Sequence, residues 1–273
     1  GVAFGLGFIV GPFLGGQLAR INVTVPVWAA TGFALVNLFM VLRLLPETHP
    51  PEERKAMPRK RDLNPFAQVA KVTANPIVGR LCLSFFLFFL AFNGFTAILV
   101  LYFKQRFNWG PELASTAFLI VGIVATVVQG GLIGPLVKRL GEWRLTLIGL
   151  SLVVTGCLLI PATSAEQAQA GIFSAVAILA TGTGLVTPSL RSLVSRRLNS
   201  EGQGAALGSL QALQSLGSFL GPPLAGLSYD LLGQTSPFLG SAGQLMAVSL
   251  LVGGTPRLLR SDGWDDTTSH PRA

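Results

Sequence analysis

Long apolar runs constrain this chain more than any other feature of its sequence. We find eight runs of about 20 residues, the length that crosses the hydrocarbon core of a bilayer. Most are apolar all round rather than striped along one side, unlike the helices of soluble proteins. They are residues 1–19, 26–45, 78–101, 113–137, 143–162, 169–194, 202–228 and 236–254. The sequence therefore predicts an all-α integral membrane protein.

The composition supports a membrane location. Hydrophobic residues make up 50% of the chain and charged residues 12%, against about 25% charged residues in soluble domains. The net charge of +8 does not indicate nucleic-acid binding, because the basic residues lie between apolar runs instead of on one face of a soluble domain. We expect a lipid bilayer as the surroundings and no nucleic acid as a partner.

The basic residues indicate an orientation. If successive connections alternate between the two sides of the membrane, every Lys and Arg except Arg20, Lys104 and Arg106 falls on one side. Positively charged loops stay on the cytoplasmic side. We therefore expect a multi-pass protein of the cell inner (plasma) membrane, with the basic connector 46–75 and the tail 257–273 in the cytoplasm.

One glycine motif occurs twice. Residues 7–16 read GFIVGPFLGG and residues 217–226 read GSFLGPPLAG, and six predicted crossings separate them. Small residues four apart share one face of a helix and allow close packing in lipid, and proline bends the helix. The motif residues are Gly7, Gly11, Pro12, Gly15 and Gly16 in the first copy, and Gly217, Gly221, Pro222 and Gly226 in the second. We expect a tight helix contact, or a contact that opens and closes during transport.

A second small-residue stripe runs through the fourth predicted span. It consists of Gly122, Thr126, Gly130 and Gly134. The stretch that follows, QGGLIGPLVKRLGEWRLTLIGL over residues 129–150, ends the span and begins the next one.

These features resemble the major facilitator superfamily, in particular its drug:proton antiporter branch and the tetracycline-efflux group. The G-x-x-x-G-P motif is similar to that branch's fifth-helix signature. The loop after residue 133 is similar to the family motif G-x-L-x-D-R-x-G-R, with Gly134, Leu136, Arg139 and Gly141 matching. Lys138 replaces the usual aspartate, and Glu142 replaces a basic residue. We also assign Arg144 to this loop motif.

The resemblance implies a fold of two six-helix halves, here truncated to about eight helices, five to twelve. Residues 1–45 would be the last two helices of the N-terminal half, and 46–75 the cytoplasmic central loop. Residues 76–256 would be the C-terminal half, and 257–273 a cytoplasmic tail. Helices one to four would be missing, so we expect that this fragment cannot transport alone. In the family the fifth and eighth helices meet, so the first motif copy and the Gly122 stripe would be partners.

The resemblance also implies a function. We expect a secondary active transporter, exporting drug-like or tetracycline-like molecules in exchange for protons by alternating access, and monomeric when full length. Two alternatives are an uptake carrier for a small metabolite and a non-transporting membrane sensor or scaffold. A scaffold predicts that substitutions at Asn93 or Thr183 change nothing.

Polar side chains inside predicted spans mark a candidate substrate cavity, because each is costly in lipid unless it faces a partner or a cavity. With the aromatic residues beside them, the candidates are Phe89, Phe92, Asn93, Thr96, Gln129, Thr183, Gln211 and Gln214. The phenylalanines could instead be packed or lipid-facing. The glutamines could instead form hydrogen bonds between helices. We group Arg191 with Arg196 and Arg197 at the cytoplasmic boundary.

Catalytic and metal-binding patterns are absent from the sequence. The two histidines, His49 and His270, lie in predicted loops, and Cys82 and Cys157 are single residues within spans. No G-x-x-x-x-G-K-[ST] phosphate loop occurs. We therefore expect no enzyme, no metal and no cofactor. No acidic residue lies near the centre of a predicted span, so either a proton-coupling carboxylate belongs to the missing helices or the protein is not proton-coupled.

Overall fold

The computed structural model describes residues 24–45, 73–197 and 203–254, together with residues 7, 10, 11, 14, 15, 18, 21, 22, 69 and 70. Every regular element in these residues is a helix, which confirms the all-α prediction. The elements are α2 (Val25–Leu44), α4 (Pro76–Phe107), α5 (Pro111–Val127), the π-helix η3 (Val128–Leu132), α6 (Ile133–Ala162), α7 (Ala168–Ser195), α8 (Gln203–Leu232) and α9 (Ser236–Gly253).

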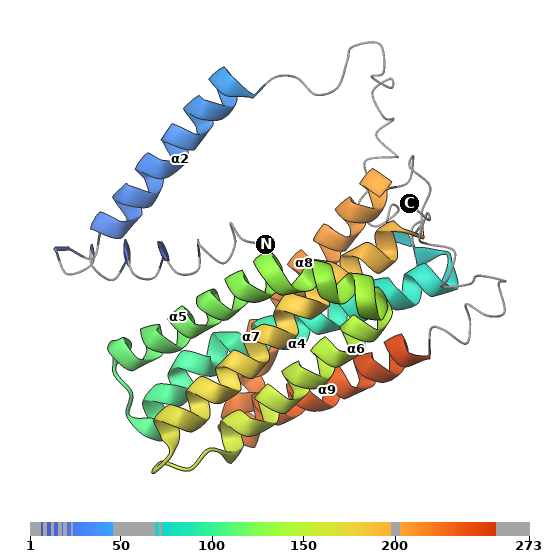
Figure 1. The fold of residues 1–273 in the computed structure, drawn as a ribbon. Helices are drawn as coiled ribbons and strands as arrows, with labels where there is room; N and C mark the ends of the chain where they lie inside the picture. The colour runs from blue at the N-terminus through green and yellow to red at the C-terminus, as the bar shows by residue number, and fades with distance from the viewer. Residues whose placement is uncertain are drawn as a thin grey trace.

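Helices α4 to α9 form one bundle (Figure 1). The most extensive contacts join α6 to α7 and α4 to α8, and α9 packs on both α4 and α6. The core contains large side chains that are fully buried, and aromatic rings of α4 and α9 are prominent among them. These rings belong to Phe85, Phe88, Phe95, Tyr102 and Phe238.

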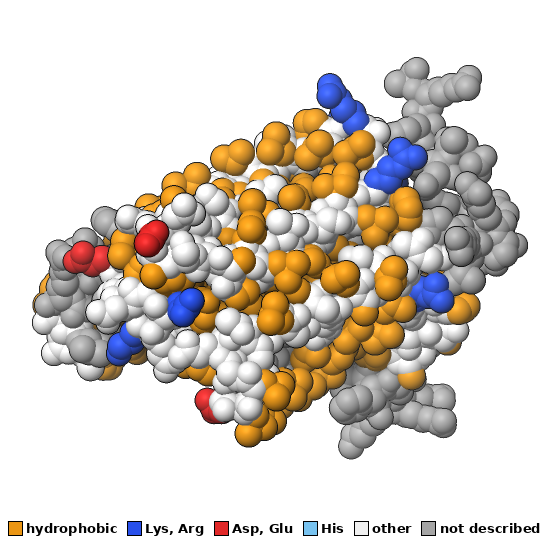
Figure 2. Space-filling view, turned by 90° about the horizontal axis from the view of Figure 1, so that it is seen from below, with side chains coloured by type: hydrophobic (Ala, Val, Ile, Leu, Met, Phe, Trp, Pro, Cys, Tyr) orange, Lys and Arg blue, Asp and Glu red, His pale blue; other side chains and the backbone are white. Residues whose placement is uncertain are grey.

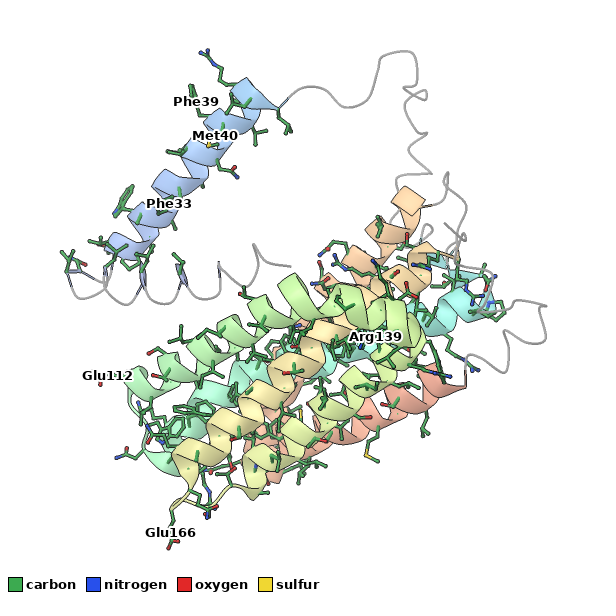
Figure 3. The ribbon with its side chains drawn as sticks, viewed as in Figure 1. Phe33, Phe39, Met40, Glu112, Arg139 and Glu166 are labelled. Atoms are coloured by element: carbon green, nitrogen blue, oxygen red, sulfur yellow. The ribbon has the colours of Figure 1, made fainter. Side chains whose placement is uncertain are left out.

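Helix α2 differs from the bundle although it is just as apolar. None of its residues is buried, and Trp28 and Phe33 are 73% and 68% exposed. It lies apart from α4 to α9 in Figure 1, and Figure 3 shows Phe33, Phe39 and Met40 along it. A helix that is apolar all round requires lipid or other helices around it.

Five helical stretches in the described residues are long and apolar enough to cross a membrane. They are Val25–Leu44, Pro76–Phe107, Glu112–Ala162, Ala168–Ser195 and Ser236–Gly253. The Glu112–Ala162 stretch contains two of the predicted spans. Helix α8, which covers the predicted span 202–228, is not among the five, and glutamines, serines and glycines interrupt its apolar residues. Most of the predicted span 1–19 lies outside the described residues.

The surface of the bundle has the pattern of a membrane protein. Figure 2 shows hydrophobic side chains along the length of the visible face, with the charged side chains toward the two ends. In Figure 3, Glu112 and Glu166 lie at one end of the bundle and Arg139 lies at the other.

Local sequence explains how α4 begins and ends. The Asn75 side chain accepts hydrogen bonds from the backbone nitrogens of Ile77 (2.9 Å) and Val78 (3.2 Å). Pro76 occupies the first helical position, where its missing N–H costs nothing. At the other end Asn108 adopts the left-handed conformation, with φ 53°, which asparagine tolerates better than most residues and which stops the helix.

One irregularity lies inside the fourth predicted span, and a second separates it from the fifth. The π-helix η3 follows α5 directly, and the sequence pattern did not predict it. Gly141 then has φ 76° and ψ 157° inside α6, a conformation that favours glycine. The chain doubles back at this point, as Figure 1 shows. The break falls between the predicted spans 113–137 and 143–162.

Candidate transport site

The second copy of the glycine motif lies in a direct contact between α8 and α4. A Cβ atom built on Gly221 would lie 2.5 Å from the carbonyl oxygen of Leu90 and 2.9 Å from the nitrogen of Gly94. A Cβ atom on Gly217 would lie 2.9 Å from the nitrogen of Leu90. Both glycines are buried. The two backbones therefore touch where neither glycine could carry even a methyl group.

The last residue of this copy lies outside that contact. Gly226 has no atom within 4 Å of a Cβ position. Pro222 is partly buried and sits inside α8. The contact thus depends on the first two glycines of the motif.

The first copy makes no such contact in the described residues. Gly7, Gly11 and Gly15 have no atom within 4 Å of a Cβ position, and the same is true of Gly134. Pro12 and Gly16 lie outside the described residues. The expected partnership between the first copy and the Gly122 stripe stays a prediction.

A second backbone contact joins α6 to α7, and the sequence analysis missed it. A Cβ atom on Gly182 would lie 2.6 Å from the carbonyl oxygen of Gly149, and one on Gly156 would lie 3.0 Å from that of Ala175. Gly149 and Gly156 are seven residues apart and therefore share one helix face. That spacing was the signal available in the sequence.

The residue after the Gly141 turn ties α6 to α7. The Glu142 Oε1 atom lies 2.8 Å from Nη2 of Arg196 and accepts a hydrogen bond from the Ser192 hydroxyl at 3.0 Å. The next residue, Trp143, donates its indole N–H to the Val252 carbonyl at 2.9 Å. Glu142, which departs from the loop motif, thus bonds to Ser192 in α7 and to Arg196 directly after it. Trp143 connects the same turn to α9.

The basic residues of the predicted loop motif lie on the surface. Lys138, Arg139 and Arg144 are exposed. Figure 3 shows Arg139 at the end of the bundle where the turn lies.

The phenylalanines of α4 pack mainly on one another. The rings of Phe88 and Phe92 stack with their centroids 6.0 Å apart, and Phe88 meets Phe89 edge to face at 5.3 Å. Phe89 is 6% exposed, whereas Phe92 is only partly buried. Such pairs add stability beyond the area they bury.

The polar candidates on α4 bond to their own helix. The Asn93 amide donates to the Phe89 carbonyl at 2.9 Å, and the Thr96 hydroxyl donates to the Phe92 carbonyl at 2.6 Å. Both residues are partly buried. The Thr96 hydroxyl and one of the two Asn93 amide hydrogens are therefore bonded within α4. The second amide hydrogen and the side-chain oxygen of Asn93 have no hydrogen-bond partner in the described residues, so another group could use them.

The structure brings Gln129 to α7. This glutamine belongs to η3, and its Cγ lies 3.7 Å from a Cβ position on Gly184. The adjacent Thr183 is partly buried and donates its hydroxyl to the Ala180 carbonyl at 3.0 Å. π-Helical turns occur frequently at functional sites.

The Arg191 side chain bonds to two glutamines of α8. Its Nη2 atom donates to Oε1 of Gln214 at 2.7 Å and to Oε1 of Gln211 at 3.2 Å. Its guanidinium lies 5.8 Å from the centre of the Phe85 ring. Arg196 pairs instead with Glu142, and the grouping of Arg191 with Arg196 and Arg197 at the cytoplasmic boundary stays a prediction. The glutamines do form a bond between helices, and they form it with a cation.

An open groove between α4, α8 and α9 lies elsewhere on the bundle. It is lined mostly by small residues, including Ala91, Gly94, Gly221, Ala225 and Ser241. None of the predicted cavity residues lines it. Gln244 at its edge donates to the Leu87 carbonyl at 2.9 Å.

A bundle of apolar helices held by glycine contacts, with charges at its ends and polar groups between helices, defines a multi-pass helical membrane protein. Residues 1–222 match the Major Facilitator Superfamily, and the chain belongs to this family of membrane transporters. Membership also agrees with the function class expected from the sequence, a transporter and not an enzyme.

Similar proteins include known resistance proteins. The chain is 30% identical over 272 residues to the tetracycline resistance protein, class C, of Escherichia coli, covering 97% of this chain and 65% of that protein. It is 27% identical over 248 residues to multidrug resistance protein 2 of Bacillus subtilis, covering 91% and 60%. The crystal structure of the human organic anion transporter MFSD10 (TETRAN) is similar, with a TM-score of 0.77 and 27% identity.

The chain spans less than two thirds of the length of these relatives. It covers 61% of the human transporter chain, although 92% of its own residues are matched there. The chain therefore corresponds to only part of the fold of these relatives.

Proposed function

We propose that this chain is part of a secondary active exporter of drug-like small molecules, exchanging them for protons by alternating access. The observation that carries the proposal is the similarity of nearly the whole chain to a tetracycline resistance protein, together with the family match. The similarity to a multidrug resistance protein supports the same substrate range.

The structure is compatible with this role. Polar groups of α7, α8 and η3 are only partly buried, although they lie within apolar helices: Gln129, Thr183, Arg191 and Gln214. Carriers that work by alternating access hold their substrate between the two halves, near the middle of the membrane. Residues of this kind are the ones that a second half would face.

We also propose the orientation expected from the basic residues. The turn at Gly141 would lie in the cytoplasm with Lys138, Arg139 and Arg144, and so would the connector 46–75. Glu112 and Glu166, at the opposite end in Figure 3, would lie outside. Cysteine labelling with a membrane-impermeant reagent at Glu166→Cys and Arg139→Cys tests this orientation, because only the first should react in intact cells.

The acidic residues bear on the mechanism of coupling. The described carboxylates are Glu112, Glu142, Glu166 and Asp230, and each lies at a helix end or in a connection. Proton exchange generally uses an ionisable group inside the membrane. In this proposal the coupling group is therefore a residue outside the described part of the chain.

Efflux measurements test the function. Cells lacking their own drug pumps and expressing the full-length protein should accumulate less tetracycline than cells with an empty vector. A protonophore should restore accumulation. Unchanged accumulation would contradict export, and efflux that continues after the proton gradient collapses would contradict proton exchange. Inward, gradient-independent movement of a metabolite would favour the uptake carrier.

A further inference from the structure

Arg191 stands in a polar cluster that the function above does not explain. The Arg191 cluster comprises Arg191 on α7, Gln211 and Gln214 on α8, and Phe85 on α4. Both glutamines accept a hydrogen bond from the same Nη2 atom, and the Phe85 ring lies 5.8 Å from the guanidinium carbon. Three helices thus hold one guanidinium group in a defined position.

The cluster lies further inside the bundle than the position of Arg191 in α7 suggests. Arg191 is four residues from the last residue of α7, but Gln211 and Gln214 are 8 and 11 residues from the first residue of α8. At about 1.5 Å per residue, these glutamines lie roughly 12 to 16 Å along α8. Arg191 and Gln214 are partly buried and Gln211 is exposed, so the cluster is open to the surface of the bundle.

The positive charge of Arg191 lacks a counter-charge among the described residues. The nearby carboxylate that could serve, Glu142, is bonded to Arg196 and Ser192. The Nε atom of Arg191 is buried without a hydrogen-bond partner. A charge held among apolar helices is costly unless an opposite charge or further acceptors complete its shell.

Most N–H donors of the Arg191 guanidinium have no acceptor in the described residues. Within the described residues the glutamine oxygens satisfy only Nη2, whereas a guanidinium carries five N–H donors. Each glutamine also has an amide nitrogen, and neither nitrogen has a hydrogen-bond partner in the described part of the chain. The cluster thus presents several donors and one positive charge, and it needs an acceptor with negative charge.

We propose that the Arg191 cluster binds a single oxyanion group, a carboxylate or a phosphate. This inference rests on the proposed export function and adds molecules that carry such a group to its substrate range. The planar fork of arginine matches the two oxygens of a carboxylate or phosphate. The glutamine amides supply further donors, and Phe85 covers the face of the guanidinium. A phospholipid headgroup carries the same chemistry as a substrate phosphate.

Two dyes of opposite charge test the proposal with the purified full-length protein in nanodiscs of phosphatidylcholine. Fluorescein carries a carboxylate, whereas rhodamine 6G has a similar ring system and a positive charge. Fluorescence polarisation should show that Arg191→Gln weakens fluorescein binding by about tenfold or more. Arg191→Lys should weaken it less, because the charge remains while the fork is lost. Rhodamine 6G binding should not weaken in either variant.

Lys104→Gln is the matched control, since it removes one exposed positive charge from the same bundle. It should bind both dyes as the wild type does. Equal elution volumes in size-exclusion chromatography show that the variants are folded.

A second arm distinguishes the source of the oxyanion. Thermal stabilisation by added phosphatidylglycerol that is lost in Arg191→Gln, with fluorescein binding unaffected, would assign the site to a lipid headgroup. Loss of fluorescein binding assigns it to a substrate. Equal behaviour of wild type and Arg191→Gln toward both probes, including no binding at all, would overturn the proposal. Tetracycline export by the wild type would remain in that case, so the proposed function would fail only by its own test.

Discussion

The two copies of the glycine motif share its G-x-x-x-G-P pattern and have opposite surroundings. In α8, Gly217 and Gly221 touch the backbone of α4, where a Cβ atom on Gly221 would lie 2.5 Å from a carbonyl oxygen. In the first copy, Gly7, Gly11 and Gly15 have nothing within 4 Å. A helix face of small residues therefore allows close packing, but it forms a contact only where a second helix lies against it.

The helices that follow the two copies differ in the same way. Helix α2 has no buried residue, whereas 39% of the most apolar stretch of α9 is buried. Both are apolar enough to span a membrane. Apolar composition directs a helix into the membrane, and its neighbours decide which face is covered.

The largest loss of stability is expected when the contact of the second copy with α4 is broken. Gly221→Leu should lower the free energy of unfolding by about 3 kcal/mol or more, because the side chain meets backbone atoms that cannot rotate away. Unfolding in sodium dodecyl sulfate measures this loss. Gly226→Leu in the same motif copy should cost far less, since nothing lies within 4 Å. Equal losses would contradict a role for the backbone contact at Gly221, since Leu is a better helix former than Gly at both positions.

A somewhat smaller loss of stability is expected at the α6–α7 contact, which involves neither copy of the glycine motif. Gly182→Ala should cost about 1 to 3 kcal/mol, because its Cβ would lie 2.6 Å from the Gly149 carbonyl oxygen. Gly184→Ala is the control on the same helix, where the nearest atom is a Val128 methyl group at 3.0 Å that can shift. The thermal unfolding midpoint compares the two, and a greater loss for Gly184→Ala would contradict the geometry.

The ion pair beside the Gly141 turn should contribute less than either glycine contact. The Arg196 side chain is 49% exposed and Glu142 13% exposed, so we expect a coupling free energy of about 0.2 to 1 kcal/mol. A double-mutant cycle with Glu142→Gln and Arg196→Gln measures it. Coupling should decrease in high salt. A value as large as the loss at Gly221 would mean that polar links, and not backbone contact, dominate the bundle.

The smallest effect on stability is expected in the first copy. Gly11→Leu should change the free energy of unfolding by no more than about 0.5 kcal/mol, as for a surface position. Transport should nevertheless fail if this face closes against the other half during the cycle. The comparison between the copies fails if Gly11→Leu destabilises the protein as much as Gly221→Leu does.

Sequence reasoning predicted the helices of the bundle well. The predicted span 169–194 corresponds to α7 at Ala168–Ser195, and the break between the fourth and fifth spans falls at Gly141. Membrane helices are readable in this way because their length is set by the bilayer and their backbone must bond within the helix.

Side-chain partners were harder to predict than helices. Arg191 is near Arg196 in the sequence, yet it bonds to Gln211 and Gln214 on α8, while Arg196 takes Glu142. The sequence did not predict these partners, because the rotation of α7 against its neighbours decides which groups meet. The α6–α7 contact was missed because Gly149 and Gly182 lie on different helices, and their pairing depends on packing that hydropathy does not encode.

The π-helix η3 has a consequence for how the stripe Gly122, Thr126, Gly130 and Gly134 is read. A turn that closes on the fifth residue holds one residue more than the α-helical repeat. The side chains that follow η3 are therefore rotated about the helix axis relative to those that precede it. Gly122 is buried, while Gly130 and Gly134 are exposed. A single inserted residue can thus divide one sequence stripe into two faces, one for the bundle and one for whatever lies outside it.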